Sequence, residues 1–226
     1  MISKARRGGI SPVGEAVTVA ANPWFKVLRQ PVDIHDPATG RLKRSAADGA
    51  QMNYLEISSP GVLIVADLGG AATLLAAQER YTTNLVEGKQ VRHYELPGGA
   101  IDSNDHSENE IIAAAEKEFG EEMGYQADDY TVLGSRKRGL MTHPYVTDHN
   151  FTVLARNARP IAGRLAHEDN EVIGAPERFS WDETHEMSDS SCGLYAPDYR
   201  EFKVISSAPT VASLALAERY INSDPR

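Results

Sequence analysis

The sequence predicts an α+β protein in which an α/β/α sandwich with a mixed β-sheet is preceded by a small N-terminal β appendage. Three observations predict this fold class. Strand-like apolar runs come first in the chain, a few helical segments follow, and further strands lie between the helices. Mixed strands with a few helices are typical of layered architectures. A chain of 226 residues is long enough to bury a sizeable core without disulfides.

The predicted strands are apolar runs bounded by turn-forming residues. In chain order they cover residues 24–30, 53–58, 62–68, 72–81, 92–96, 130–134 and 151–156. The segment DPATG at residues 36–40 predicts a turn after the first strand. Gly69 and Gly70 separate the third run from the fourth, and this short spacing predicts a β-hairpin.

Three helices are predicted from their start signals. These signals are Ser107 with Glu110, Ser180 with Glu183, and Ser207 with Pro209. The first two pairs are capping-box signatures, and Gly124 is expected to end the first helix. The third helix is Ala-rich and closes the chain. Its apolar positions, which are expected to pack on the rest of the fold, are Val211, Leu214, Leu216 and Ile221.

The expected domain organisation has three parts. Residues 1–20 are expected to be a flexible tail, residues 21–59 a strand appendage, and residues 60–226 the main domain with its C-terminal helix. The N-terminal segment carries basic residues but no continuous apolar run, so a signal peptide is not predicted.

Composition and charge exclude several functional classes. With 23 basic and 32 acidic residues, the net charge of −9 argues against nucleic acid as a partner. The single Cys192 excludes an intrachain disulfide and a multi-Cys zinc site, and a reducing compartment fits best. No apolar run approaches the ~20 residues that span a bilayer. We therefore expect a cytoplasmic protein with no membrane partner.

The helix after Ser107 combines an apolar stripe with a cluster of acids. At roughly 100° per residue, one face carries Ile111, Ile112, Ala115, Phe119 and Met123. Glu118 and Glu122 stack beside this stripe, and Glu121 lies on the same side. Such carboxylates repel one another by about 0.2–0.5 kcal/mol even when exposed, and partial burial raises the cost. Mg²⁺, which prefers oxygen ligands together with substrate phosphates, would offset this repulsion.

A solvated acidic helix face is the alternative interpretation of the same run. Two features favour a metal site. Gly120 costs about 1 kcal/mol relative to Ala inside a helix, which indicates close approach of another chain segment or a ligand. The PGG segment at residues 97–99 precedes the helix, and its backbone carbonyls could complete a coordination shell.

This stretch resembles the Nudix box, G-x5-E-x7-R-E-U-x-E-E-x-G-U, where U is aliphatic or aromatic. The residues at the C-terminal acid and U positions are Glu118, Phe119, Glu121, Glu122 and Tyr125. The resemblance implies that Glu118 and Glu122 are the principal metal ligands. It also implies that Glu121 is a secondary ligand within the catalytic group, and that the carbonyl of Gly98 helps to bind the metal.

The sequence departs from the box at two places. Lys117 stands where the pattern has Arg, so a planar fork of donors is replaced by a point charge. The segment between Gly99 and Glu118 is also longer than in the pattern. The first acid of the box is therefore unassigned, and its candidates are Asp105, Glu108 and Glu110.

Beyond the box, nearly the whole chain after residue 22 resembles ADP-ribose pyrophosphatases. The segment at residues 22–42 is similar to their N-terminal strand pair, which swaps between subunits and implies a homodimer. VLIVADLGGAATLLAAQERY followed by YELPGG is similar to a second passage of that branch, and on this match Arg80 contacts a phosphate. An ordinary strand-end Arg is the alternative.

Two further site residues follow from the same resemblance. HEDNEVI at residues 167–173 matches the acidic loop that supplies the base, with Glu171 as that base and Asp169 and Glu168 behind it. A plain polar loop is the alternative. Trp24 either stacks on adenine from the partner subunit or fills the dimer core.

These features predict a pyrophosphohydrolase that uses Mg²⁺, or alternatively Mn²⁺. Its expected substrate is a nucleoside diphosphate linked to another moiety, foremost ADP-ribose, which yields AMP and ribose 5-phosphate. A nucleotide-sugar or dinucleotide hydrolase, acting for example on GDP-mannose or NADH, is one alternative. A non-catalytic Nudix-fold module that binds a nucleotide is the other. Lys117 favours that module, whereas the retained acids oppose it.

Overall fold

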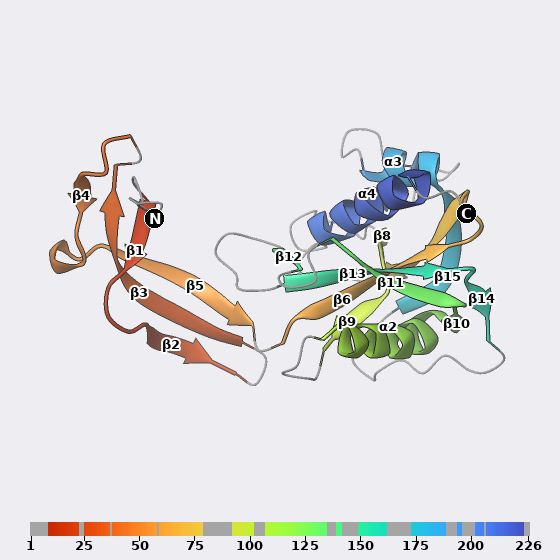
Figure 1. The fold of residues 1–226 in the computed structure, drawn as a ribbon, viewed down its shortest axis with the longest axis horizontal. Helices are drawn as coiled ribbons and strands as arrows, with labels where there is room; N and C mark the ends of the chain where they lie inside the picture. Colours follow the sequence, from red (N-terminus) through yellow and green to blue (C-terminus); the bar gives the residue numbers. More distant parts are fainter. Residues whose placement is uncertain are drawn as a thin grey trace, which may run out of the picture. The chain divides into compact units, whose positions relative to one another are not determined.

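The structure is a computed structural model, and its described residues fall into two compact units. The described residues are 9–22, 25–36, 38–57, 59–78, 92–101, 107–134, 139–141, 149–161, 173–188, 194–195, 202–205 and 207–223. The first unit lies within residues 9–57, and the second begins at residue 59. Figure 1 traces both units along the chain.

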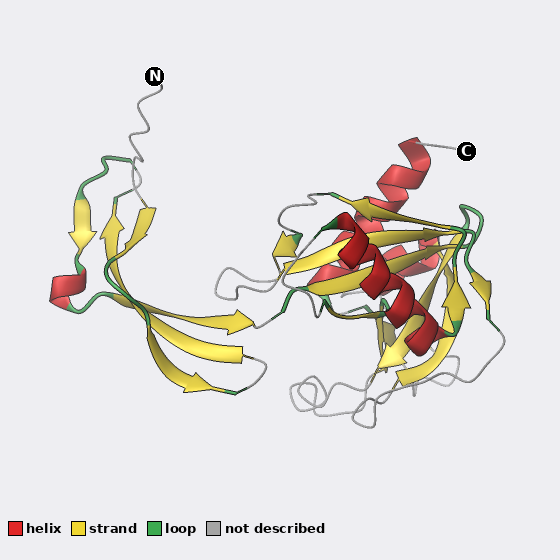
Figure 2. Cartoon of the chain, turned by 60° about the horizontal axis from the view of Figure 1, so that its bottom comes forward, coloured by secondary structure: helices red, strands yellow, loops and turns green. Residues whose placement is uncertain are grey.

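The N-terminal unit is a small antiparallel sheet centred on one long strand. Its elements are β1 (Gly9–Pro12), β2 (Val17–Ala21), β3 (Phe25–His35), β4 (Leu42–Arg44), η1 (Ala46–Asp48) and β5 (Gln51–Ile57). Strand β3 pairs antiparallel with each of the other four strands. Figure 2 shows that this unit is built of strands with one short helical turn.

The expected tail over residues 1–20 is wrong where the structure describes it, because residues 9–12 and 17–21 are strands. Every residue of β2 is exposed. Backbone pairing with β3 therefore holds β2 in place, and burial contributes little. A strand of this kind has no buried face, although its β-branched residues Val17, Thr18 and Val19 are typical of strands.

The turn expected over residues 36–40 is present at its described residues. Asp36 Oδ1 accepts hydrogen bonds from the backbone N–H groups of Ala38 and Thr39, at 2.9 and 2.8 Å. Lys43 Nζ lies 2.9 Å from the other carboxylate oxygen of Asp36. The Lys43 ammonium and these N–H donors hold the pKa of the Asp36 carboxyl well below its usual range.

The second unit contains the described helices α2, α3 and α4 among short strands. Its elements are β6 (Gly61–Asp67), β7 (Ala72–Gln78), β8 (Arg92–Glu95), β9 (Gly98–Ala100), α2 (Glu108–Met123), β10 (Tyr125–Gln126), β11 (Asp129–Leu133), β12 (Leu140–Met141), β13 (His149–Arg156), β14 (Arg159–Pro160), β15 (Ile173–Ser180), α3 (Trp181–Ser188), β16 (Leu194–Tyr195), β17 (Phe202–Val204) and α4 (Ala208–Ser223). One sheet runs β11-β13-β6-β9, with β12 beside β13, and a second runs β15-β7-β8-β17-β16. Strands β10 and β14 form a separate pair.

Strand β6 shows why this unit has layers on both sides. Val62, Ile64 and Ala66 belong to the core cluster that contains the apolar face of α2. Val65 belongs instead to the cluster that contains Leu214 of α4. Successive side chains of a strand point to opposite faces, so the alternation places a helix on each side. Figure 1 shows α2 on one side of β6 and β13, with α3 and α4 on the other.

The predicted α/β/α sandwich with a mixed sheet is therefore confirmed. Strand β13 pairs parallel with β6 and antiparallel with β11, which makes the sheet mixed. The C-terminal helix packs as expected, since Leu214 is buried and Val211, Leu216 and Ile221 are partly buried against the same cluster.

The hairpin predicted across Gly69 and Gly70 is wrong. Strand β6 pairs with β9 and β13, whereas β7 pairs with β8 and β15. Both glycines have positive φ, of 84° and 79°, and the chain turns there from one sheet into the other. The local turn signal was correct, but the choice of partner strand depends on residues far away in the sequence.

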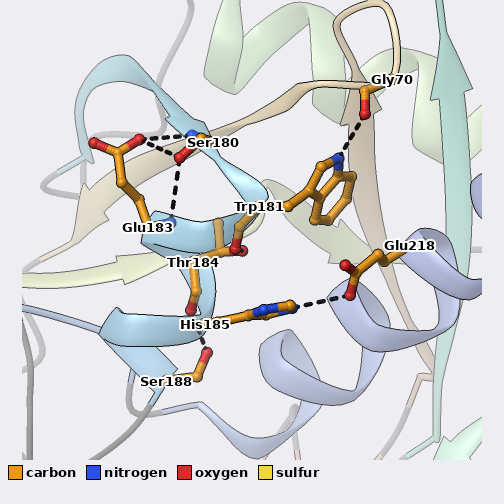
Figure 3. A network of polar contacts seen from close by, with 8 residues as sticks. All are labelled: Gly70, Ser180, Trp181, Glu183, Thr184, His185, Ser188 and Glu218. Carbon is orange, nitrogen blue, oxygen red and sulfur yellow. Dashed lines mark hydrogen bonds and ion pairs between the residues drawn. The ribbon is translucent and has the colours of Figure 1, made fainter.

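Both predicted capping boxes are at helix starts. Ser107 Oγ accepts from the N–H of Glu110 at 3.4 Å, and Gly124 ends α2 in the left-handed conformation. At the start of α3 the box is reciprocal. The N–H of Ser180 donates to Glu183 Oε2 at 2.7 Å, and the N–H of Glu183 donates to Ser180 Oγ at 3.2 Å (Figure 3).

Side chains of α3 tie this helix to its neighbours. Trp181 Nε1 donates to the carbonyl of Gly70 at 3.2 Å, and His185 Nε2 lies 2.9 Å from Glu218 Oε2 of α4 (Figure 3). These contacts fix α3 between the β6–β7 turn and α4. None of the helices in the described residues is long and apolar enough to cross a membrane.

Candidate active site on helix α2

The apolar face of α2 is buried as the spacing predicts. Ile111, Ala115, Phe119 and Met123 are at most 1% exposed, and Ile112 is partly buried against the same cluster. This burial fixes the rotation of the helix about its axis, because the apolar stripe must face the hydrophobic core. The carboxylates of Glu118 and Glu122 are thereby held at the border of the core.

Glu122 is a buried carboxylate with a backbone donor. The residue is 4% exposed, and its Oε2 accepts a hydrogen bond of 2.9 Å from the N–H of Gly98 in β9. Burial of a carboxylate is unfavourable unless hydrogen bonds or an opposite charge compensate it. The N–H group of Gly98 in β9 therefore compensates part of the cost of burying the Glu122 carboxylate. The carbonyl of Gly98, which the resemblance implies as a metal ligand, belongs to the same residue whose N–H meets Glu122.

Glu118 lies against the next residue of the same strand. A Cβ atom added to Gly99 would stand 2.4 Å from Glu118 Cδ and 2.6 Å from Glu118 Oε1. The side chain of Glu118 is 14% exposed. Glycine at position 99 is thus required to leave room for the carboxylate. The dipeptide Gly98–Gly99 consequently brings the two predicted principal ligands to one piece of backbone.

A lysine lies beside this pair of carboxylates. Lys117 Nζ is 3.3 Å from Glu118 Oε1 and 3.6 Å from Glu121 Oε2. The side chains of Lys117 and Glu121 are 55% and 44% exposed. The lysine in the position of the box Arg therefore pairs with two of the three predicted metal ligands.

The open side of this cluster is a hollow of about 330 Å³. Its lining residues are Ala100, Ile101, Glu110, Ala113, Ala114, Lys117 and Glu118. Three of these residues are small alanines, and three carry charged side chains. Of the candidates for the first acid of the box, Glu110 lines this hollow, Glu108 lies in the first turn of α2, and Asp105 lies outside the described residues.

Gly120 is not crowded by any described chain segment, so of the predicted close approach by another segment or a ligand the first is not found there. A Cβ atom added there would meet Ile161 Cδ1 at 3.9 Å, which is ordinary van der Waals contact. Within the described residues, no segment approaches Gly120 closely enough to require glycine.

Replacing Gly120 with alanine is therefore expected to stabilise the protein. Alanine is favoured over glycine in a helix interior by about 1 kcal/mol, and the added methyl group fills open space beside Ile161. Chemical denaturation of Gly120→Ala should give a higher midpoint with an unchanged slope. Destabilisation by 1 kcal/mol or more would contradict this, since it would mean that position 120 is crowded.

The donor set beside Gly98 and Gly99 fits a hard divalent cation. Two nearly buried carboxylates, Glu118 and Glu122, meet at a backbone cradle that a Cβ atom would fill. The described residues nevertheless contain no group of three His, Cys, Asp or Glu side chains gathered for a metal. Glu121 is the predicted ligand that stands apart, because it is half-exposed and paired with Lys117.

The other predicted site residues lie outside the described residues. These are Trp24, Arg80, Glu168, Asp169 and Glu171. The structure therefore brings together Gly98, Glu118 and Glu122 from the predicted set. Sequence reasoning missed Gly99, although its place beside Gly98 in the PGG segment was a usable signal.

Residues 58–200 match the family model of the NUDIX domain, which covers more than half of the chain. The chain belongs to the Nudix family. This confirms the family predicted from the box, and the protein is a Nudix hydrolase. Nudix enzymes generally use divalent metal ions and act on small nucleotide derivatives, in agreement with the donor set on α2.

Two solved structures are similar to this Nudix hydrolase. The crystal structure of an ADP compounds hydrolase matches with 19% identity and a TM-score of 0.61, over 100% of both chains. A NUDIX hydrolase from Nitrosomonas europaea matches with 14% identity and a TM-score of 0.48, over 73% of this chain and 89% of that chain. The first match supports the fold. Among curated proteins, none matches the sequence significantly.

Proposed function

We propose that this Nudix hydrolase cleaves a nucleoside diphosphate linked to another moiety, and that ADP-ribose, giving AMP and ribose 5-phosphate, is its substrate. The observation that carries the proposal is the meeting of Glu118 and Glu122 at the Gly98–Gly99 backbone. Such a pair of carboxylates, next to an open hollow, suits a cation that carries a diphosphate.

The chain's own residues have distinct tasks in this proposal. Glu118 and Glu122, with Glu121 and the Gly98 carbonyl, hold Mg²⁺ or Mn²⁺. The bound ion supplies positive charge that neutralises the diphosphate. Glu171 accepts the proton of the attacking water, with Asp169 behind it. The water oxygen bonds to one phosphorus while the bond from that phosphorus to the bridging oxygen breaks.

The segments that border the acidic loop support the role of Glu171. The N–H of Ile161 donates to the carbonyl of Gly124 at 2.9 Å, just beyond the end of α2. Ile173 packs against the core cluster that contains Phe119 and Met123 of α2. Ile161 and Ile173, the described residues on either side of this loop, therefore contact the end of α2 and the core cluster of α2.

The substrate itself rests on similarity. The matched crystal structure is that of an ADP compounds hydrolase, and the match extends over the whole of both chains, N-terminal unit included. In this proposal Arg80 steadies a phosphate oxygen and Trp24 stacks on the base from the partner subunit.

The test is a chromatographic screen of nucleoside diphosphate derivatives with Mg²⁺ or Mn²⁺. Release of AMP from ADP-ribose, faster than nucleotide release from GDP-mannose or NADH, is the expected result. Faster cleavage of another substrate would overturn ADP-ribose and keep the reaction class. Calorimetric binding of ADP-ribose without any product would instead favour a nucleotide-binding module.

The proposed enzyme is a homodimer formed through its N-terminal unit. Six large hydrophobic side chains are exposed among the described residues, and five of them lie in this unit. These five are Ile10, Val13, Val17, Val19 and Leu42, at 39–61% exposure. We infer that apolar side chains of this unit are covered by a second copy of the chain.

Light scattering on the full chain tests the dimer. The native protein should have the mass of two chains, and the double variant Val17→Ser, Val19→Ser should shift toward one. Thr18→Ser on the same strand is the control and should remain dimeric. A native protein with the mass of one chain would overturn the assignment.

A further inference from the structure

Lys117 forms ion pairs with two of the carboxylates of the proposed site. Its Nζ atom lies 3.3 Å from Glu118 and 3.6 Å from Glu121. Two negative charges thus share one ammonium. Lys117 and Glu118 both line the hollow, so the ammonium and the carboxylate face the same open space.

The side chain of Lys117 is much more exposed to solvent than that of Glu118. Glu118 is 14% exposed and is confined by the Gly99 backbone, whereas Lys117 is 55% exposed. The lysine stem is flexible and its ammonium has access to water, so it can swing away while the carboxylate stays. An arginine would instead tend to hold a carboxylate through paired donors in a fixed plane.

We propose that Lys117 competes with the divalent cation for Glu118 and Glu121, and so sets the concentration of metal ion at which the site fills. This inference rests on the proposed metal site of Glu118, Glu121 and Glu122. With no metal bound, the ammonium offsets the repulsion between the two carboxylates. With metal bound, the ammonium and the divalent cation repel each other, so the contacts of Lys117 with Glu118 and Glu121 weaken.

The metal affinity should therefore rise when the positive charge is removed. Lys117→Gln is expected to bind Mn²⁺ about tenfold more tightly than the native chain, as Coulomb repulsion of a divalent ion by a nearby ammonium implies. Without metal, the variant should unfold at a lower temperature, because the repulsion of Glu118 and Glu121 is no longer offset. Its gain in unfolding temperature on saturation with Mn²⁺ should exceed that of the native protein.

Two variants serve as controls. Lys117→Arg retains the charge and should bind Mn²⁺ within about threefold of the native protein, well short of the tenfold gain expected for Lys117→Gln. Arg219→Gln removes one positive charge from an exposed position on α4, on the opposite side of the sheet from α2 (Figure 1). It should leave the Mn²⁺ affinity unchanged, which separates a local effect from one of net charge.

The experiment is calorimetric titration of each full-length variant with Mn²⁺, without substrate, followed by thermal unfolding with EDTA or with saturating Mn²⁺. Tighter binding by Lys117→Gln alone supports the inference even if ADP-ribose proves to be the wrong substrate. Equal or weaker binding by Lys117→Gln overturns it while the metal site stands. A native chain that binds no Mn²⁺ overturns both this inference and the metal site.

Discussion

Glu122→Gln should reduce kcat/KM for the diphosphate substrate by at least about 100-fold. Glu122 is 4% exposed and its carboxylate already holds the N–H of Gly98 at 2.9 Å. Glutamine has the same shape, and its carbonyl oxygen can still accept that hydrogen bond, so the fold should be retained. What the variant loses is the charge that a divalent cation needs. Glu118→Gln should reduce kcat/KM in the same way, since the carboxylate of Glu118 packs against Gly99, the residue next to Gly98.

The measurement is steady-state hydrolysis with Mg²⁺, together with Mn²⁺ titration and thermal unfolding in EDTA. Glu116→Gln is a matched control, because Glu116 is exposed on the same helix and the change removes the same charge. It should retain native activity. If Glu118→Gln and Glu122→Gln both turn over substrate at the native rate, the metal-binding assignment is wrong.

Gly99→Ala should reduce activity by roughly 10- to 100-fold with little loss of stability. A Cβ atom at this position would lie 2.4 Å from Glu118 Cδ, so the carboxylate must move. Because Glu118 is a side chain with free rotations, it can move without disturbing the backbone. The predicted cost is therefore a displaced ligand. It should appear as weaker Mn²⁺ binding and a lower kcat/KM.

Gly98→Ala is the informative contrast. Its Cβ atom would lie 2.1 Å from the backbone oxygen of Val62 in the paired strand β6, and backbone cannot yield as a side chain can. Denaturation should show Gly98→Ala to be the less stable of the two variants. Gly120→Ala is also a glycine-to-alanine substitution, but at a position where the added methyl group has room, so it should leave activity unchanged. Native activity in Gly99→Ala would show that Glu118 does not need its present position.

Several features were predictable because they depend on residues close together in the sequence. Ser107 and Gly124 mark the ends of α2, since caps satisfy backbone groups within one turn of the helix. The position of Glu122 beside the core followed from the spacing of Phe119 and Met123.

The errors have the opposite origin. Strands β1 and β2 lie within the predicted tail because none of their residues is buried, and pairing with β3 holds them in place. The segments on either side of Gly69 and Gly70 were predicted to pair, but each pairs elsewhere, and strand partners are chosen by the packing of the whole sheet. Gly120 predicts close approach of another chain segment or a ligand, but no segment among the described residues comes close enough to require glycine.

The family, the ends of α2 and the register that sets Glu118, Glu121 and Glu122 on one side of that helix all follow from local spacing in the chain. What the carboxylates contact depends instead on how distant strands pair. The pairing of β9 with β6 brings Gly98 to Glu122 and Gly99 to Glu118. That pairing is a non-local choice, stabilised by backbone hydrogen bonds and core packing for which no short stretch of sequence carries the signal.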